Sequence, residues 1–186
     1  MVREATMQDK PLVDALARVF SRYGYEGANI GRLSEAVDLR RASLYHRFPG
    51  GKDEIVQAII ARQTERYETI LAPAYEDGDP AERARLVAEG MADYYDNGQA
   101  SCLIIALSLS DDESRSQGGD CVLGWADGFV QIAKDAGMTK KQAEETALDA
   151  VAGIEGALVV SSTTGKTGPF KRAMAELPDR LTVVKK

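Results

Sequence analysis

Apolar residues recur at helical spacing in nearly every segment of this chain, and that periodicity is the strongest constraint on its fold. The three-to-four-residue interval holds over residues 9–23, 52–71, 79–97 and 139–164, where it places the apolar side chains on one face. Glycine and proline separate these segments from one another. The sequence therefore predicts an all-α protein of about nine helices.

Two short helical segments follow the first one, with only a small break between them. Asn29 is a suitable N-cap for a helix that ends near Val37, and a second helix is expected from about Arg40 to Phe48. Helices this short and this close cannot be collinear if both bury their apolar faces on the first helix. The first three helices are therefore expected to form a helix-turn-helix.

Charge is distributed unevenly along the chain, whose formal net charge is -6. Residues 1–52 carry 9 Lys/Arg and 6 Asp/Glu, a net charge of +3, whereas residues 53–186 carry 14 and 23, a net charge of -9. The basic part attracts a polyanion and the acidic part repels it. We therefore expect a domain over residues 1–52 that approaches nucleic acid, and a separate helical domain over residues 53–186.

The second short helix carries side chains suited to the major groove of DNA, namely Arg40, Arg41, Ser43, Tyr45, His46 and Arg47. Arginine can bind guanine O6 and N7 through two hydrogen bonds, serine can reach several base edges, and tyrosine and histidine can donate to phosphates. A run of charges on a short helix is also commonly a solvated face that binds nothing. For Tyr45 the alternative to phosphate contact is inward packing beside Phe48.

The run from Leu33 to Ile60, LSEAVDLRRASLYHRFPGGKDEIVQAII, resembles the DNA-binding signature of TetR-type transcriptional regulators. Val19-Phe20 and Gly24-Tyr25-Glu26 fit the same signature. The resemblance implies an all-helical homodimer with an N-terminal helix-turn-helix and a C-terminal domain that binds a small effector and releases operator DNA. The extra glycine in Pro49-Gly50-Gly51-Lys52 resembles the LmrA/YxaF-like branch of the family.

The same resemblance implies roles for individual side chains. Tyr45 and His46 are expected against backbone phosphates, and Lys52 is expected to place its ammonium near another phosphate. Base contacts are expected from Arg40, Arg41 and Ser43. With Asn29 added, these seven residues are the expected DNA-binding set.

Two positions depart from the family pattern. Asp38 stands where the turn usually has glycine, and Arg40 stands where a small N-cap residue usually precedes the recognition helix. Asp38 is expected to adopt a left-handed conformation in the turn and to supply the cap in place of Arg40. Both departures bear on the angle at which the recognition helix docks.

An effector pocket is expected in the C-terminal domain, lined by Met91, Tyr94, Tyr95, Cys102, Trp125 and Phe129. Large aromatic and adaptable side chains on adjacent helices can enclose an apolar ligand with few polar groups. The alternative is that these residues are ordinary core. Cys102 has no basic neighbour in sequence to activate its thiol, which favours inert burial over a sensor of oxidants.

A stripe of small residues follows the helix expected over residues 139–164. Such a stripe lets two helices approach closely, either inside one subunit or between two subunits. TetR-type dimers pair their last two long helices in a four-helix bundle. The resemblance therefore places the dimer interface at Ala147, Ala150, Gly153 and Ala157.

Helix breaks are expected at three places in the second half of the chain. Gly118-Gly119 is expected to interrupt the helix that resumes at Cys121, Gly165 to end the helix that a Thr139 capping box begins, and Pro178 to interrupt the last helix. Residues 99–110, apolar nearly all round, are expected to be a buried helix.

The residue inventory argues against an enzyme. The chain has one histidine, so a two-histidine metal site is excluded and His46 is the only imidazole base available for a Ser-His-Asp triad. Its two cysteines lie far apart in sequence and indicate no metal site. We expect no cofactor and no metal. No signal peptide or membrane-spanning run is visible, so a cytoplasmic location without a membrane partner is expected.

These observations predict a ligand-responsive transcriptional regulator. It is expected to bind double-stranded, palindromic operator DNA as a homodimer and to act as a repressor that a small, largely apolar effector releases. Two alternatives are an enzyme with an accessory basic domain and a helical adaptor that binds protein through its acidic surface.

Overall fold

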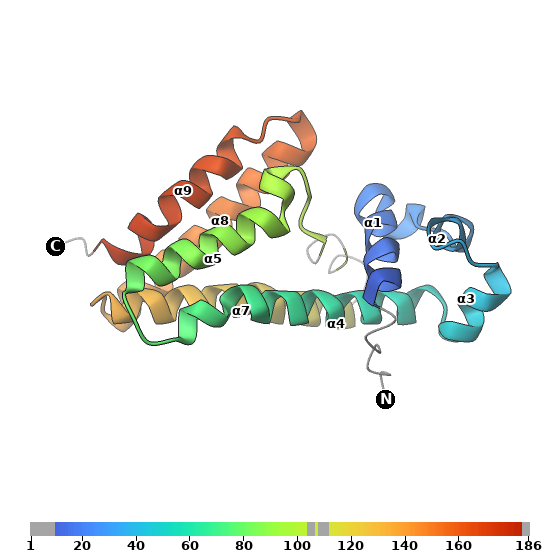
Figure 1. Ribbon diagram of the computed structural model, residues 1–186, viewed down its shortest axis with the longest axis horizontal. Coiled ribbons are helices and arrows are strands. Elements are labelled where there is room, and N and C mark those ends of the chain that lie inside the picture. The colour runs from blue at the N-terminus through green and yellow to red at the C-terminus, as the bar shows by residue number, and fades with distance from the viewer. Residues whose placement is uncertain (1–9, 104–106, 108–111, 184–186) are drawn as a thin grey trace. The chain divides into compact units, whose positions relative to one another are not determined.

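The computed structural model describes residues 10–103, 107 and 112–183. Within these residues the chain forms eight α-helices and no strand, which confirms the predicted all-α fold (Figure 1). The helices are α1 (Lys10–Gly27), α2 (Ile30–Ala36), α3 (Arg41–Arg47), α4 (Lys52–Leu71), α5 (Pro80–Tyr94), α7 (Asp112–Asp135), α8 (Lys140–Thr164) and α9 (Gly168–Thr182). Two short 3₁₀ helices, η1 (Ala72–Tyr75) and η2 (Asp96–Gly98), flank α5.

The chain packs into two compact units. The first contains Met1–Arg66 and Leu103–Gly119, and the second contains Tyr67–Cys102 and Asp120–Lys186. Both α4 and α7 therefore contribute residues to each unit. The expected domain boundary after Lys52 stays a prediction.

Helices α1, α2 and α3 of the first unit follow the predicted order closely. Asn29 caps α2 by accepting a hydrogen bond from the Arg32 backbone N–H at 3.1 Å, as expected. Helix α1 does not end at Gly24 but kinks there, with φ 66°, and continues to Gly27. The core that unites the three helices with α4 consists of fully buried apolar side chains: Leu16, Phe20, Leu33, Leu44, Ile55 and Ile59.

An ion-pair network ties the start of α1 to the middle of α4. Arg62 lies 3.3 Å from Asp14 and 2.9 Å from Glu65, and Lys10 forms a further pair with Glu65. Hydrogen bonds from Lys10 and Arg62 hold the pKa of the Glu65 carboxyl below its usual range. The first helix is therefore fastened to α4 by charge as well as by apolar contacts.

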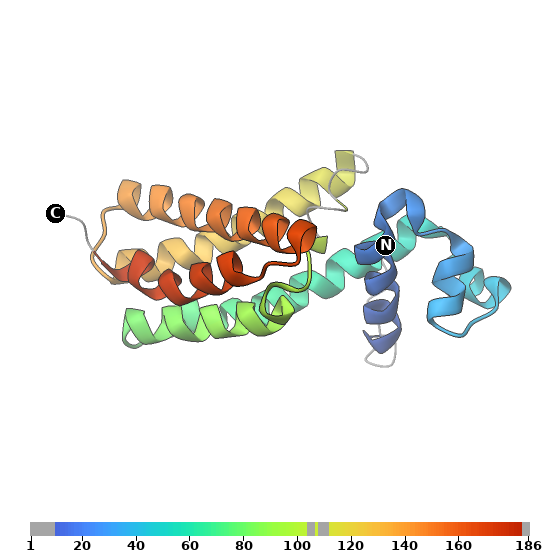
Figure 2. The ribbon, with the colours of Figure 1, turned by 90° about the horizontal axis from the view of Figure 1, so that it is seen from above.

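In the second unit, α9 packs against both α5 and α8 (Figure 2). Thr139 and Gln142 form the predicted capping box of α8, and Gly165 ends that helix in the left-handed conformation with φ 71°. Asp79 caps α5 by accepting from the Ala81 N–H at 3.2 Å. Sequence signals thus place the ends of these helices correctly.

Two of the expected helix breaks are wrong. Helix α7 runs through Gly118 and Gly119, because glycine weakens a helix by only about 1 kcal/mol and breaks it only where the chain turns. Helix α9 runs through Pro178, whose missing N–H removes one hydrogen bond. Burial of Phe170, Met174, Leu177 and Leu181 on one face outweighs that loss.

The expected buried helix at residues 99–110 lies partly outside the described residues. Of that block, residues 99–103 and 107 are described. Residues 99–102 are not helical, so the expected start of this helix is wrong, whereas Leu103 and Leu107 are helical and buried. In the described parts of the chain, no helix is long and apolar enough to cross a membrane.

Candidate functional site

The turn between α2 and α3 depends on a left-handed residue. Asp38 adopts φ 51°, as predicted for the position where the turn would otherwise need glycine. The Leu39 N–H donates to the Ser34 carbonyl at 3.0 Å and fixes the direction in which the chain leaves α2. The conformation lets α3 leave α2 at an angle, so that both helices pack on the same core.

The expected cap from Asp38 is wrong. The residue before α3 is Arg40, in an extended conformation, and its side chain makes no capping hydrogen bond. No hydrogen bond among the described residues joins the Asp38 side chain to α3. The first backbone N–H groups of α3 are therefore left to other acceptors, and such groups attract anions.

Helix α3 buries one face and exposes the other. Leu44 and Phe48 are buried, 1% and 7% exposed, and fasten the helix to the core. The exposed side chains are those the sequence nominated: Arg40, Arg41, Ser43, Tyr45, His46 and Arg47. Tyr45 is 49% exposed, which excludes the inward-packing alternative for its ring. The short helix thus presents a continuous cationic and polar face to solvent.

The turn after α3 accommodates the ring of Tyr45. Gly51 has φ 67°, a conformation that favours glycine, and a Cβ at this position would lie 3.6 Å from Tyr45 Cε1. The ring therefore lies along the turn that begins α4, with its hydroxyl edge open to solvent. Glu54 holds the same turn by accepting from the Gly50 N–H at 2.7 Å.

Arg41 extends over the start of α2. Its Nη2 and the Asn29 Oδ1 each lie 3.1 Å from the point that a Cβ at Gly31 would occupy. The absence of a side chain at Gly31 therefore makes room for the guanidinium beside Asn29. The structure brings Asn29 and Arg41, two of the predicted DNA-binding residues, to one place.

Lys52 is more constrained than the sequence indicated. Its ammonium donates to the Tyr25 carbonyl at 2.8 Å and lies 3.9 Å from the centroid of the Tyr25 ring. The Tyr25 hydroxyl in turn donates to Asp53. Lys52 therefore fastens α4 to the end of α1, and its half-buried ammonium retains donors for a phosphate.

The first unit has a second cationic group, which the sequence-based predictions did not include. The guanidinium carbons of Arg22 and Arg32 lie 5.3 and 4.5 Å from the centroid of the exposed Tyr23 ring. Arg32 also donates to the Gly27 carbonyl at 2.6 Å. The sequence could have indicated this group, because Arg32 stands three residues after the Asn29 cap and lies on the exposed side of α2.

The predicted pocket residues lie in an aromatic cluster of the second unit. Ring centroids are 4.7 Å apart for Tyr94 and Tyr95, 4.8 Å for Tyr67 and Trp125, and 6.4 Å for Trp125 and Phe129. Met91, Tyr95, Trp125 and Phe129 are buried, whereas Tyr94 and Cys102 are half-buried. The sequence missed three members of this cluster, Tyr67, Glu155 and Phe170, because they come from the distant helices α4, α8 and α9.

Polar atoms form a continuous line through this aromatic cluster. The Tyr94 hydroxyl donates to the Tyr67 hydroxyl at 3.3 Å, and the Tyr95 hydroxyl lies 3.8 Å from the Cys102 sulfur. Burial raises the pKa of the Tyr67 and Tyr95 hydroxyls well above their usual range. Burial also raises the pKa of the Glu155 carboxyl, and a hydrogen bond with Cys102 opposes that shift.

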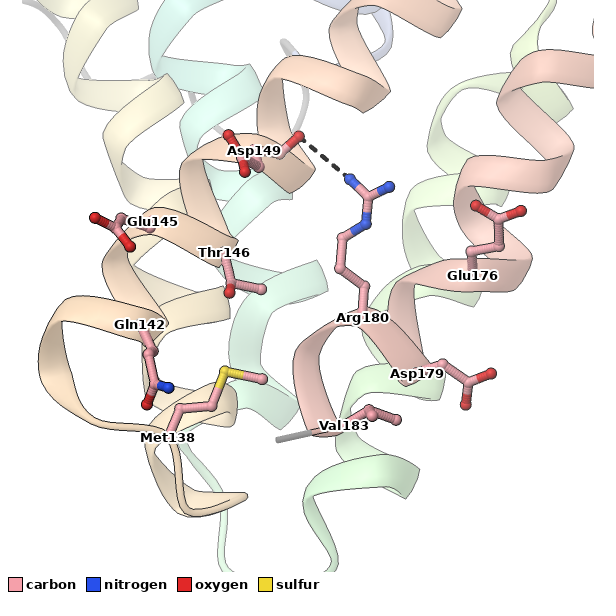
Figure 3. Close-up of a pocket in the computed structure, with 9 residues that line it drawn as sticks. All are labelled: Met138, Gln142, Glu145, Thr146, Asp149, Glu176, Asp179, Arg180 and Val183. Carbon is pink, nitrogen blue, oxygen red and sulfur yellow. Dashed lines mark hydrogen bonds between the residues drawn. The ribbon is translucent and has the colours of Figure 1, made fainter. Parts of the chain in front are cut away.

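Two grooves lie between α8 and α9. The larger, about 740 Å³, is lined by both helices and has acidic side chains from Glu145, Asp149, Glu176 and Asp179 (Figure 3). Arg180 extends into it and donates to the Asp149 carbonyl at 3.3 Å. The smaller groove, about 290 Å³, is lined by small and apolar residues such as Gly153, Gly156 and Val160, and by the charged residues Arg172, Glu176 and Arg180.

The predicted dimer residues divide into two groups. Ala147, Ala150 and Ala157 are buried within the single chain, at 0%, 1% and 8% exposure, so they have almost no surface left to cover. Gly153 is exposed. Helix α9 packs against α8. The exposed residues of the same stretch include Gly153, Gly156, Val159 and Val160.

Two family models match the chain. The model described as "Bacterial regulatory proteins, tetR family" matches residues 12–59, and the one described as "Transcriptional regulator LmrA/YxaF-like, C-terminal domain" matches residues 80–176. The first match contains α2, α3 and the turn between them. The second contains most of the aromatic cluster and most of the residues that line the two grooves.

Curated relatives agree with these models. The HTH-type transcriptional regulator LmrA of Bacillus subtilis (strain 168) is 23% identical over 177 residues, which cover 91% of this chain and 94% of LmrA. The HTH-type transcriptional repressor Rv1474c of Mycobacterium tuberculosis is 28% identical over 124 residues, which cover 67% of this chain and 59% of that protein.

Solved structures share the fold. A TetR transcriptional regulator from Legionella pneumophila superposes with a TM-score of 0.81 at 13% identity, and covers 94% of this chain and 96% of its own. A TetR-family regulator from Cytophaga hutchinsonii gives a TM-score of 0.73 at 21% identity over 100% of both chains. At these identities the likeness establishes the helical architecture alone.

Proposed function

The chain belongs to the TetR family of bacterial transcriptional regulators, in its LmrA/YxaF-like branch, and we propose that it is a homodimeric repressor that a small effector releases from operator DNA. Regulators of this family bind DNA through the helix-turn-helix. The outward cationic face of α3 is the observation that carries the proposal.

The exposed face of α3 has side chains suited to contacting base edges and side chains suited to binding phosphates. Arg40, Arg41 and Ser43 lie on its exposed side at the start of the helix, where a recognition helix meets base edges. Tyr45 and His46 follow on the exposed side, where their donors suit phosphates. Lys52, fixed by Tyr25, adds a charge at the start of α4. Arg22 and Arg32 are proposed to make further contacts with the DNA backbone.

The dimer is proposed to form through the exposed side of α8 and the adjacent part of α9. Added Cβ atoms at Gly156 would meet nothing within 4 Å, and at Gly153 only the Arg180 guanidinium, so a helix of a second copy can approach closely there. Val159 and Val160 are 60% and 42% exposed and supply apolar surface. A dimer carries two α3 helices, one for each half-site of a palindromic operator.

The effector is proposed to bind at the aromatic cluster. Side chains from five helices meet there, so a ligand that separates or orders them changes the packing of α4, α5, α7, α8 and α9 together. Helix α4 begins at Lys52, beside the proposed DNA contacts. A ligand with higher affinity for the conformation that does not fit DNA would weaken operator binding by that difference in affinity.

Two substitutions test the DNA-binding assignment. Arg41→Ala is expected to weaken operator binding by about 1–3 kcal/mol and to relax sequence preference, since a base contact is lost. Lys52→Ala is expected to weaken binding to all duplexes alike and to lower the slope of log K against log salt by about 1. Fluorescence anisotropy with operator and random duplexes at several salt concentrations measures both effects.

Arg85→Ala is the matched control. Arg85 is an exposed cation of α5 in the second unit, paired with Glu82 and Glu89, and its removal should leave DNA affinity unchanged. If the Arg41 and Lys52 variants bind operator as tightly as the unsubstituted chain, α3 is not the recognition helix.

A further inference from the structure

Gly31, the second residue of α2, lies between two side chains of the proposed DNA-binding face. A Cβ at Gly31 would lie 3.1 Å from the Nη2 and 3.9 Å from the Cζ of Arg41, and 3.1 Å from the Oδ1 of Asn29. Arg41 therefore reaches from α3 back over the start of α2, into space that a side chain at residue 31 would need. The backbone of Gly31 is not left-handed, so its conformation does not require glycine.

The two neighbours of Gly31 differ in how freely they can move. The Asn29 oxygen is held by the cap of α2, since it accepts a hydrogen bond from the Arg32 backbone N–H at 3.1 Å. The Arg41 guanidinium lies at the end of a long, exposed side chain, and none of the ion pairs between described residues includes it. A contact of 3.1 Å to a carbon is closer than ordinary van der Waals contact. A side chain at residue 31 would therefore displace the guanidinium and leave the cap in place.

The position of the guanidinium determines which base edge Arg41 can contact. Two N–H groups of an arginine must align with O6 and N7 of one guanine, and a displaced guanidinium loses that alignment. An arginine that is already held near its bound position also loses less side-chain freedom when it binds. The room left by Gly31 therefore bears on base recognition, although glycine has no side chain that could contact DNA.

We propose that Gly31 is a specificity-determining residue of this regulator: by lacking a side chain, it sets the place of the Arg41 guanidinium beside Asn29, and so the base pair that Arg41 reads. The inference rests on the proposed operator binding and adds to it the residue that directs one base contact. Gly31 is a positioning residue, since it acts through Arg41. A side chain at residue 31 changes which sequences the chain prefers and leaves its folding intact.

Sequence preference is measured by binding the full chain to a pool of DNA duplexes with a randomised central segment and sequencing the bound fraction. The unsubstituted chain is expected to select one base pair strongly in each half-site, at the position that Arg41 reads. Gly31→Ala and the bulkier Gly31→Leu are expected to lower that preference by about 5-fold or more, because a bidentate contact accounts for roughly 5- to 150-fold discrimination. Preference at the other positions of the half-site should stay unchanged.

The route through Arg41 is tested by combining substitutions. An Arg41→Ala chain has no guanidinium to displace, so adding Gly31→Ala to it is expected to change the preference at any position by less than about 2-fold. An effect of Gly31→Ala that is equally large with and without Arg41 overturns the proposal. So does a Gly31→Ala chain that selects the same bases as strongly as the unsubstituted chain.

Gly124→Ala is the matched control. Gly124 is a helical glycine on α7 in the second unit, and a Cβ there would meet nothing within 4 Å. Alanine favours a helix over glycine, so both alanine variants should unfold thermally at or above the temperature of the unsubstituted chain. Only Gly31→Ala should change sequence preference. A Gly31→Ala chain that unfolds well below that temperature overturns the proposal, because the cap of α2 and not the guanidinium would then have given way.

The same selection separates this inference from the proposed function. A pool from which the unsubstituted chain selects no sequence overturns the proposed function, and the inference with it. A chain that selects half-sites, but whose preference Gly31→Ala leaves intact, overturns the role of Gly31 alone.

Discussion

Val160→Asp is expected to convert the proposed dimer into a monomer and to lower operator affinity by about 100-fold or more. Val160 is 42% exposed beside the smaller α8–α9 groove, where a second copy is proposed to pack. An aspartate at this position in each copy would lose its hydration on association, and that cost opposes the dimer. A monomer engages one half-site instead of two, and the gain from bivalent binding is lost.

Sedimentation velocity and anisotropy with a full operator measure the two effects together. Leu86→Asp is the matched control, since Leu86 is 40% exposed on α5 and away from the grooves. That variant should remain dimeric and bind operator normally. A Val160→Asp chain that stays dimeric would place the interface on another surface.

Arg83→Leu is expected to lower the free energy of unfolding by about 3 kcal/mol. The Arg83 side chain is 7% exposed and joins three parts of the second unit. It donates to the Pro73 carbonyl at 3.1 Å, to the Ala74 carbonyl, and to Asp135 at 2.9 Å. Leucine removes these three hydrogen bonds; the Pro73 carbonyl keeps the Glu76 N–H as a donor and Asp135 keeps the Gln131 amide.

Arg85→Leu is the control for this loss, because Arg85 lies two residues further along α5 and is also paired with carboxylates. Its side chain is 48% exposed, so the substitution should leave the free energy of unfolding nearly unchanged. Urea unfolding followed by circular dichroism measures both variants. Similar losses for the two would mean that burial of Arg83 does not determine its contribution.

The pH dependence of this clamp has a defined direction. Burial opposes ionisation of Asp135, but the hydrogen bond from Arg83 holds the pKa of that carboxyl below the 3.8 of a free aspartate. The contribution of the pair to stability is therefore fully present above pH 3.8 and is lost as the pH falls through the lower, folded-state pKa. The difference in stability between the two arginine variants should accordingly become smaller at strongly acid pH, by the part that Asp135 contributes, while the part from the Pro73 and Ala74 carbonyls remains.

The turn between α2 and α3 shows which properties local sequence predicts and which it does not. Asp38 was expected to be left-handed because it stands where the family that the sequence resembles has a turn glycine, and its φ of 51° confirms this. Its expected capping role was wrong, since side-chain direction depends on how α2 and α3 pack. Backbone conformation was encoded locally, whereas the hydrogen-bond partner was not.

The stripe of small residues on α8 illustrates the opposite case. Spacing alone was compatible with packing inside one chain or between two chains. Ala147 and Ala150 are buried within the chain, whereas Gly153 and the neighbouring valines are exposed. A helix has several faces, and only its tertiary neighbours determine which of them is covered.

By itself, the sequence determined that this protein is helical, where most helices begin and end, and that α3 carries a cationic face, because these properties depend on residues within one or two turns. The tertiary structure decided that Glu155 meets Tyr95, that Lys52 is fastened by Tyr25, and that Arg83 clamps α5 to α7. Such contacts join residues separated by tens of positions, and local periodicity carries no information about which distant faces meet.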